Sequence, residues 1–234
     1  MGEMDLQHYP SIRRLPIGRQ ADCKPKTVMS ASETEKIFNG QRLVVEEKFN
    51  GTAKMFHADN GRFTILSEDM LRYKPGLTGR YSVPSRYVVW DIFDNKRKVF
   101  VSFLEKEDIF KSIKQNEIHV KERNSYDFML ASVLAHGCSF RPEDMPAFLD
   151  MLSRYAMDLK TERSTYMEGI VIKPAREMFF PEYERLVSKL IRNEYLYGKT
   201  GIEENYMRLP VRYNNINPRY GLEDPNFWKR RTSL

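Results

Sequence analysis

The pattern of apolar and polar positions in the first third of the chain predicts a β-hairpin. A mostly apolar strand pattern occupies 42–45, apolar and polar positions are mixed at 53–57, and another mostly apolar strand pattern follows at 62–66. Asn60-Gly61 stands between the last two runs and favours a tight turn, because both residues tolerate positive φ. We therefore expect strands across residues 41–66, with Gly51 interrupting the first of them.

A second hairpin is predicted downstream. Residues 87–93 form a nearly continuous apolar run, Asp94-Asn95-Lys96 supplies turn residues, and residues 99–101 are again apolar. The segment between the two hairpins is rich in Gly, Pro and Arg at 75–80, which predicts a loop.

The middle of the chain predicts helices. Residues 124–127 carry start signals before an apolar-periodic stretch that stops at Gly137, and Pro142-Glu143-Asp144 opens another stretch to about residue 158. Residues 166–172 return to a strand pattern. Strand-rich ends around a helical middle, without regular βαβ alternation, predict an α+β fold built on antiparallel sheets.

Length and composition indicate a folded protein that works away from membranes. The chain has 234 residues, of which 41% are hydrophobic and 30% charged, and it lacks an apolar run of the roughly 20 residues that a membrane helix needs. The N-terminus lacks the features of a secretory signal, and Cys23 and Cys138 form no metal-binding spacing. We expect no membrane association, a cytoplasmic location and reduced thiols. The net charge of +6 suits a polyanionic partner but does not require one.

The stretch Glu46-Glu47-Lys48-Phe49-Asn50-Gly51 carries the most chemical information. A lysine amine is a nucleophile only when it is deprotonated, and partial burial, neighbouring cations or a bound metal-nucleotide can lower its pKa. Lys48 is therefore the candidate for covalent catalysis. By itself, a lysine followed three residues later by glycine is common by chance, and an exposed lysine at a strand end would look the same.

Further motifs follow in order along the chain, namely Trp90-Asp91 on an apolar strand, Met167-Glu168-Gly169-Ile170-Val171-Ile172-Lys173-Pro174, and Leu186-Val187-Ser188-Lys189. This ordered set resembles the covalent nucleotidyltransferase superfamily of ATP-dependent DNA and RNA ligases and mRNA capping enzymes. Arg192-Asn193-Glu194-Tyr195-Leu196-Tyr197-Gly198 is similar to the RNA ligase branch, including the ligase domain of bacterial polynucleotide kinase-phosphatase RNA repair enzymes. The resemblance implies an antiparallel-sheet adenylyltransferase domain over residues 1–201. The remaining residues 202–234 form a short C-terminal extension, too short for a separate OB-fold.

The resemblance also implies roles for individual residues. Lys48 would attack the α-phosphate of ATP to form lysyl-AMP and release pyrophosphate. Glu168 would hold Mg²⁺ or Mn²⁺, with Asp91 as a further metal ligand in place of a missing glutamate. Trp90 would stack on the nucleobase, although an ordinary core tryptophan explains it too. The implied nucleotide-binding residues are Glu46, Glu47, Asn50, Gly51, Trp90, Glu168, Lys173 and Lys189.

The chain also departs from the family. Ser67-Glu68 stands where the family has a Ser-Arg pair, and a Gly-Glu pair that precedes the aromatic strand is missing. Lys189 lacks the second base that usually follows two residues later, where this chain has Ile191.

The expected substrate is a set of RNA ends or nicks, presented with the help of an end-processing or RNA repair partner protein. Bases alternate with aromatic residues in the 72–87 segment, which is a pattern that single-stranded nucleic acid favours, although a solvated loop explains it equally well. Two other functions stay open, a DNA ligase or GTP-using capping enzyme, and a catalytically weak nucleic-acid-binding domain with a ligase-like fold. The candidate nucleic-acid contacts are Arg72, Lys74, Arg80, Arg86 and Arg192.

Overall fold

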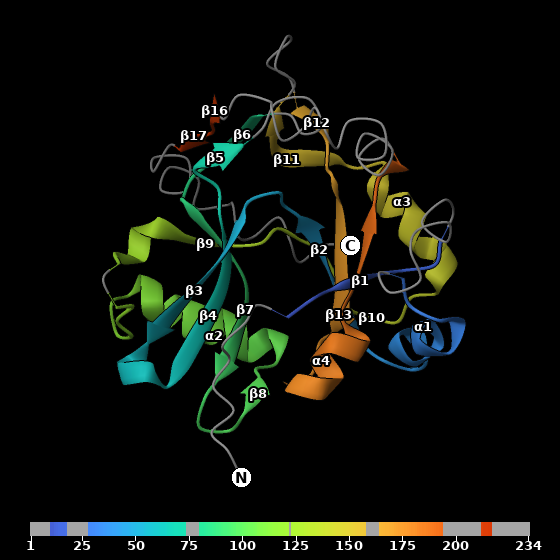
Figure 1. Ribbon diagram of the computed structural model, residues 1–234, viewed down its shortest axis with the longest axis horizontal. Coiled ribbons are helices and arrows are strands. Elements are labelled where there is room, and N and C mark those ends of the chain that lie inside the picture. The colour runs from blue at the N-terminus through green and yellow to red at the C-terminus, as the bar shows by residue number, and fades with distance from the viewer. Residues whose placement is uncertain are drawn as a thin grey trace.

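The computed structural model describes residues 10–17, 28–73, 80–121, 123–157, 164–193 and 212–216. Two large sheets lie beside each other, with helices packed around them and smaller sheets at one end (Figure 1). Most strand pairs are antiparallel, so the predicted α+β class with antiparallel sheets is confirmed.

The first large sheet places the lysine motif on a central strand. Its order is β1-β15-β13-β2-β10, and β2 pairs in an antiparallel manner with both β13 and β10. Central strands are covered on both faces, which explains the nearly unbroken apolar sequence of β13. The strands are β1 (Arg13–Arg14), β2 (Leu43–Lys48), β10 (Val133–Cys138), β13 (Gly169–Pro174) and β15 (Ser188–Ile191).

The second large sheet contains both predicted hairpins. Its order is β14-β8-β7-β4-β3, and β9 pairs in parallel with β7. A short 3₁₀ turn, η3 (Asp59–Gly61), joins β3 to β4, with positive φ at Asp59, Asn60 and Gly61. The strands are β3 (Thr52–Ala58), β4 (Phe63–Asp69), β7 (Tyr87–Asp94), β8 (Val99–Phe100), β9 (Phe128–Leu130) and β14 (Met178–Phe179).

The chain changes sheets directly after Lys48. Strand β2 belongs to the first sheet and β3 to the second, so residues 49–51 cross between them. The prediction of one continuous hairpin over residues 41–66 is therefore correct only for β3 and β4. The crossing leaves the end of β2 between the two sheets.

Small sheets close one end of the molecule (Figure 1). One has the order β12-β11-β6-β17 and the other pairs β16 with β5. Asn214, between β16 and β17, donates its side-chain amide to the Met70 carbonyl and accepts from the Tyr81 N–H, so this part of the extension is joined to the body of the protein. The strands are β5 (Arg72–Tyr73), β6 (Arg80–Val83), β11 (Leu152–Met157), β12 (Ser164–Tyr166), β16 (Arg212–Tyr213) and β17 (Asn215–Ile216).

The two longest helices begin at side-chain caps. Ser30 forms a capping box with Glu33, and the Ser102 hydroxyl accepts from the Glu105 N–H, which satisfies backbone donors at each start. The second helix packs against the second sheet through Ile109, Phe110 and Ile113. The helices are α1 (Ala31–Phe38), α2 (Phe103–Lys114), α3 (Met145–Leu149) and α4 (Phe180–Leu186), with 3₁₀ turns η4 (Ser125–Asp127) and η5 (Pro142–Asp144).

The predicted helical middle is largely wrong. Only η4 is helical in the stretch that ends at Gly137, because the following residues pair as β9 and β10. Helical structure after Pro142 ends at Leu149, and β11 takes the residues that follow. No helix in the described part of the chain is long and apolar enough to cross a membrane.

Candidate active site

Lys48 and Glu168 meet where β2 and β13 lie side by side. Gly169 pairs with Lys48 in the strand register, so the preceding Glu168 reaches the same end of the sheet. The Lys48 Nζ lies 2.7 Å from Glu168 Oε1 and donates to the Phe49 carbonyl, while the two side chains are 15% and 6% exposed. The sequence prediction that these two residues share a site agrees with this geometry.

Gly169 allows this close approach. A Cβ atom at this position would lie 2.3 Å from the Leu190 carbonyl oxygen of the neighbouring strand, a distance that no side chain tolerates. Glycine is therefore required so that β13 and β15 can pair beside Glu168.

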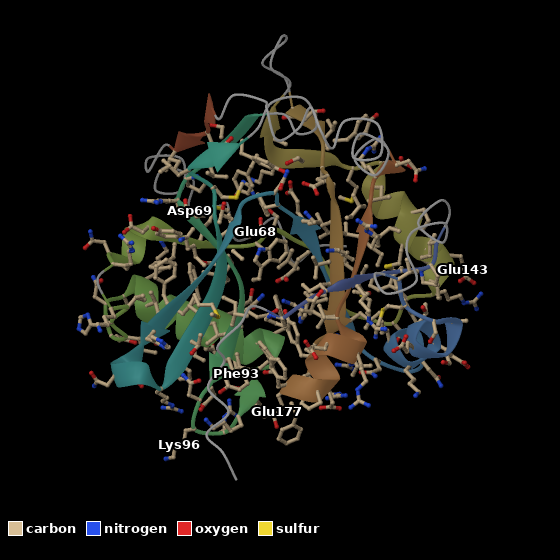
Figure 2. The ribbon with its side chains drawn as sticks, viewed as in Figure 1. Glu68, Asp69, Phe93, Lys96, Glu143 and Glu177 are labelled. Carbon is tan, nitrogen blue, oxygen red and sulfur yellow. The ribbon has the colours of Figure 1, made fainter. Side chains whose placement is uncertain are left out.

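A second carboxylate, Glu68, lies close to Lys48 from the opposite sheet. Its Oε2 accepts a hydrogen bond from the Gly51 N–H at 2.6 Å, because β3 pairs with β4 at the crossing. Figure 2 labels Glu68 on the second sheet, near the middle of the molecule. The sequence showed Glu68 only as a departure from the family pattern, so this acidic neighbour was missed as a site residue.

The surrounding charges keep Lys48 protonated. Burial acts to lower the pKa of Lys48, but the negative charges of Glu168 and Glu68 outweigh burial and raise this pKa. Burial raises the pKa of Glu68 to about 7, and the nearby Glu168 adds to this effect while Lys48 and Lys189 oppose it. The residues around Lys48 therefore raise its pKa, because two carboxylates face one amine.

Two further basic residues come from adjacent strands of the first sheet. Lys189 on β15 lies beside β13, and Arg14 on β1 pairs with Lys189 in the strand register. The Arg14 charge acts to lower the pKa of Lys48, which places the guanidinium near the amine. Sequence reasoning missed Arg14 because it lies far from the recognised motifs. These residues make the site a mixture of two carboxylates and three cations.

Glu46, Lys173 and Asp91 belong to a buried charge network rather than to the Lys48 site. Glu46 lies 2.7 Å from the Lys173 Nζ and also pairs with Lys106, while Lys173 lies 2.6 Å from Asp91 Oδ1. The Tyr183 hydroxyl donates to Asp91 Oδ2 at 2.6 Å. The positive charges of the two lysines balance the negative charges of the two carboxylates, and all four side chains are almost inaccessible to solvent. Because both Asp91 oxygens have partners, we withdraw Asp91 as a metal ligand and Lys173 as a phosphate contact.

Lys106 was not predicted as part of this network. It donates to the Trp90 carbonyl, as Lys173 also does, and therefore links α2 to both large sheets. Burial lowers the pKa of Lys106, while Glu46 opposes the change. A signal was present in the sequence, since Lys106 interrupts the apolar stripe of α2 between Phe103 and Phe110.

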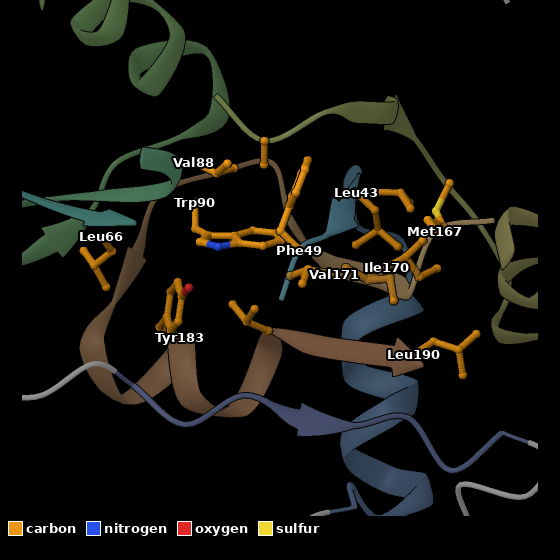
Figure 3. Packing of buried hydrophobic residues seen from close by; sticks show 14 of the residues in the cluster. Leu43, Phe49, Leu66, Val88, Trp90, Met167, Ile170, Val171, Tyr183 and Leu190 are labelled. Carbon is orange, nitrogen blue, oxygen red and sulfur yellow. The ribbon is translucent and has the colours of Figure 1, made fainter. Parts of the chain in front are cut away.

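Trp90 is a core residue. It is 2% exposed, and its ring packs edge-on against Phe49 with a centroid separation of 6.1 Å. Figure 3 shows the indole among Val88, Phe49 and Tyr183. A nucleobase would have to displace this packing in order to stack there, so the structure favours the core interpretation over the predicted stacking role.

Glu47 lies in the interior as well. The Ser153 hydroxyl of β11 donates to the Glu47 carboxylate, and Glu47 is 1% exposed. Neighbouring residues on a strand point to opposite faces, so Glu47 lies on the other face of β2 from Glu46 and Lys48. Asn50 and Gly51 lie at the crossing itself, directly after Lys48 and Phe49.

The predicted nucleic-acid contacts have mixed placements. Arg86 forms a bidentate ion pair with Asp69, which occupies two of its guanidinium nitrogens. Arg192 stacks on Tyr166, with its guanidinium carbon 4.4 Å from the ring centroid. Lys74 and the side chains of Arg72 and Arg80 lie outside the described residues.

Glu168 has the properties of a metal ligand. Its Oε2 atom is buried and has no hydrogen-bond partner among the described residues, and carboxylate oxygens suit Mg²⁺ and Mn²⁺. No group of three or more His, Cys, Asp or Glu residues that could hold a metal occurs in the described ranges. Such sites commonly complete their coordination with substrate phosphates and water, so Glu168 fits this pattern.

No protein-family model and no curated protein matches the chain. Among solved structures, the RNA ligase of Naegleria gruberi with PPi is similar at a TM-score of 0.48 and 14% identity, covering 73% of this chain and 56% of the ligase chain. A mutant apo form of that ligase gives 0.48 at 13% identity, covering 73% and 54%. A mutant with ATP and Mn gives 0.46 at 14% identity, covering 72% and 54%. This chain spans a little over half the length of those ligase chains, at low identity.

Proposed function

We propose that the chain is an ATP-dependent RNA ligase that forms lysyl-AMP on Lys48. The observation that carries this proposal is the contact between a mostly buried lysine amine and the Glu168 carboxylate, held by adjacent strands and followed by Lys189 on the next strand. A nucleophile, a metal-binding carboxylate and a phosphate-binding cation are the groups that nucleotidyl transfer requires.

The first step joins the Lys48 Nζ to the α-phosphorus of ATP and breaks the bond to pyrophosphate. The amine must lose a proton before it attacks, since an ammonium has no free electron pair. Lys189 and Arg14 would stabilise the negative charge that develops on the phosphate oxygens and on the leaving group. A 5′-phosphate then displaces Lys48 to take the AMP, and a 3′-OH displaces AMP to seal the strand.

Glu168 is the residue of this chain that would hold Mg²⁺ or Mn²⁺. When bound there, a divalent cation supplies positive charge for the phosphates and competes with the Lys48 ammonium for the carboxylate, which favours the neutral amine. Because the pKa of Lys48 is raised, its amine would need this competition from the metal to lose its proton.

In this proposal the substrate is a set of RNA ends or nicks, and the enzyme acts in RNA repair. It would work in the cytoplasm together with an end-processing partner protein. The similar solved structures are RNA ligases, some with ATP or AMP and Mn. A DNA ligase, a capping enzyme or a catalytically weak binding domain would differ in nucleotide choice, in the preferred strand or in turnover.

The test is covalent labelling by α-labelled ATP with Mg²⁺ or Mn²⁺, followed by denaturing electrophoresis. We expect labelled wild-type protein and no label in Lys48→Ala or Lys48→Arg, because arginine keeps the charge but stays protonated. Lys36→Arg on the exposed face of α1 is the matched control and should label normally. Stronger labelling by GTP would indicate capping, and absence of label with every nucleotide would leave only the binding domain.

A further inference from the structure

The hairpin of β11 and β12 has two different faces. On the inner face, Ser153 donates to Glu47, and the Tyr155 ring lies 6.0 Å from that of Phe49, so this face packs into the protein. On the outer face, Leu152 lies opposite Tyr166 in the strand register, and these side chains are 58% and 46% exposed. Three of the five exposed large hydrophobic residues in the described ranges lie on this hairpin or directly before it, namely Met151, Leu152 and Tyr166.

Arg192 fixes the position of this outer face relative to the active site. Its guanidinium covers one face of the Tyr166 ring at 4.4 Å, and its Nη1 donates to the Leu149 carbonyl. Its backbone N–H donates to the Glu168 carbonyl at 2.9 Å. Tyr166 is therefore close to Glu168 in two ways. It precedes Glu168 by two residues, and Arg192 contacts both the Tyr166 ring and the Glu168 backbone.

An exposed ring backed by a guanidinium suits one kind of ligand particularly well. Nucleobases stack on aromatic side chains regardless of sequence, and a nearby arginine attracts the phosphate backbone. A purely apolar partner surface would leave the Arg192 charge and the exposed Arg154 on the same strand poorly matched. The mixture of an aromatic ring, an aliphatic side chain and positive charge favours single-stranded RNA.

We infer that Tyr166, Leu152 and Arg192 form a stacking platform for an unpaired nucleobase of the RNA strand that is brought to Lys48. The inference rests on the proposed function for its choice of RNA, and it adds a binding surface that lies outside the nucleotide-transfer residues. The base would stack on the part of the Tyr166 ring that Arg192 leaves open, with Leu152 against its edge.

The experiment measures binding of a fluorescent, 5′-phosphorylated single-stranded RNA by anisotropy across a salt series. Tyr166→Ala should weaken binding by about five-fold or more, as expected for the loss of one stacked base, while Tyr166→Phe should retain most of the affinity. Phe179→Ala removes a still more exposed aromatic side chain elsewhere, on β14, and should bind RNA like the wild type. Thermal unfolding of each variant separates loss of binding from loss of folding.

ATP labelling of the same proteins distinguishes this inference from the proposed function. If the wild type forms lysyl-AMP and Tyr166→Ala binds RNA with unchanged affinity, the platform is refuted and the ligase proposal stands. If the wild type takes up no label but Tyr166→Ala still weakens RNA binding, the platform stands and the ligase proposal fails. Equal losses in Tyr166→Ala and Phe179→Ala would show a general surface effect and would also refute the platform.

Discussion

Glu68 gives the chain a dependence of stability on pH that a single substitution should remove. Its carboxyl group accepts from the Gly51 N–H and lies near the carboxylate of Glu168. Burial first, and the charge of Glu168 next, raise its pKa from 4.5 to about 7, even though Lys48 and Lys189 act in the opposite direction. The folded protein therefore holds this proton more tightly than the unfolded chain does.

The sign and size of the effect follow from this difference. A raised carboxyl pKa adds stability that is fully present below pH 4.5 and is lost as pH rises to about 7. The free energy of unfolding should fall by about 1.4 kcal/mol per pH unit inside this window, or about 3 kcal/mol in all. Above about pH 8 the carboxylate is charged in both states and its contribution becomes constant.

Urea unfolding of the wild type and of Glu68→Gln between pH 5 and pH 8 measures this effect. Glutamine keeps an oxygen for the Gly51 N–H but cannot ionise, so the variant should gain about 2.5 kcal/mol relative to the wild type as pH rises from 5 to 8. Glu33→Gln is the control, because the Arg13 hydrogen bond lowers the pKa of Glu33 to about 2 and this residue is ionised in both states throughout the window. Parallel pH profiles for the wild type and Glu68→Gln would refute the reasoning.

Other substitutions test the site and its support. Glu168→Ala and Lys189→Ala should each lower the rate of lysyl-AMP formation by about 10² or more, measured in single-turnover labelling, if they stabilise the transferring phosphate; near-normal rates would remove that role. Lys106→Met should lower the free energy of unfolding by about 3–5 kcal/mol in urea, because it leaves the buried Glu46 with one cation instead of two. Lys111→Met on the exposed face of the same helix should change the free energy of unfolding little. Equal losses in Lys106→Met and Lys111→Met would show that the buried charge network does not stabilise the fold.

Local signals in the sequence predicted the parts of the fold that local interactions determine. The hairpin of β3 and β4 and that of β7 and β8 each join strands that are neighbours in the sequence, with turn residues between them. The stretch before Gly137 was mistaken for a helix because its strands pair with distant partners, β9 with β7 and β10 with β2. Periodicity within a short apolar stretch cannot reveal such pairing.

The contacts around Lys48 were predicted in part, for a similar reason. Lys48 and Glu168 could be identified because each lies in a recognisable motif, and the register of β2 and β13 brings them together. Glu46, Asp91 and Lys173 lie in motifs too, but their partners include Lys106 on a helix that the sequence pattern did not predict. Whether a charged side chain faces a substrate or another buried charge depends on packing between distant segments.

The buried network also determines how the protein can come apart. Glu46 and Lys173 belong to the first sheet, Asp91 to the second, and Lys106 to the helix that covers the second sheet. Separating the two sheets would break the ion pairs that cross between them, Lys106 with Glu46 and Lys173 with Asp91, and breaking a buried ion pair is costly. We therefore expect the two sheets to unfold together as one cooperative unit. Residues 49–51, which cross between the sheets directly after Lys48, should unfold only with them.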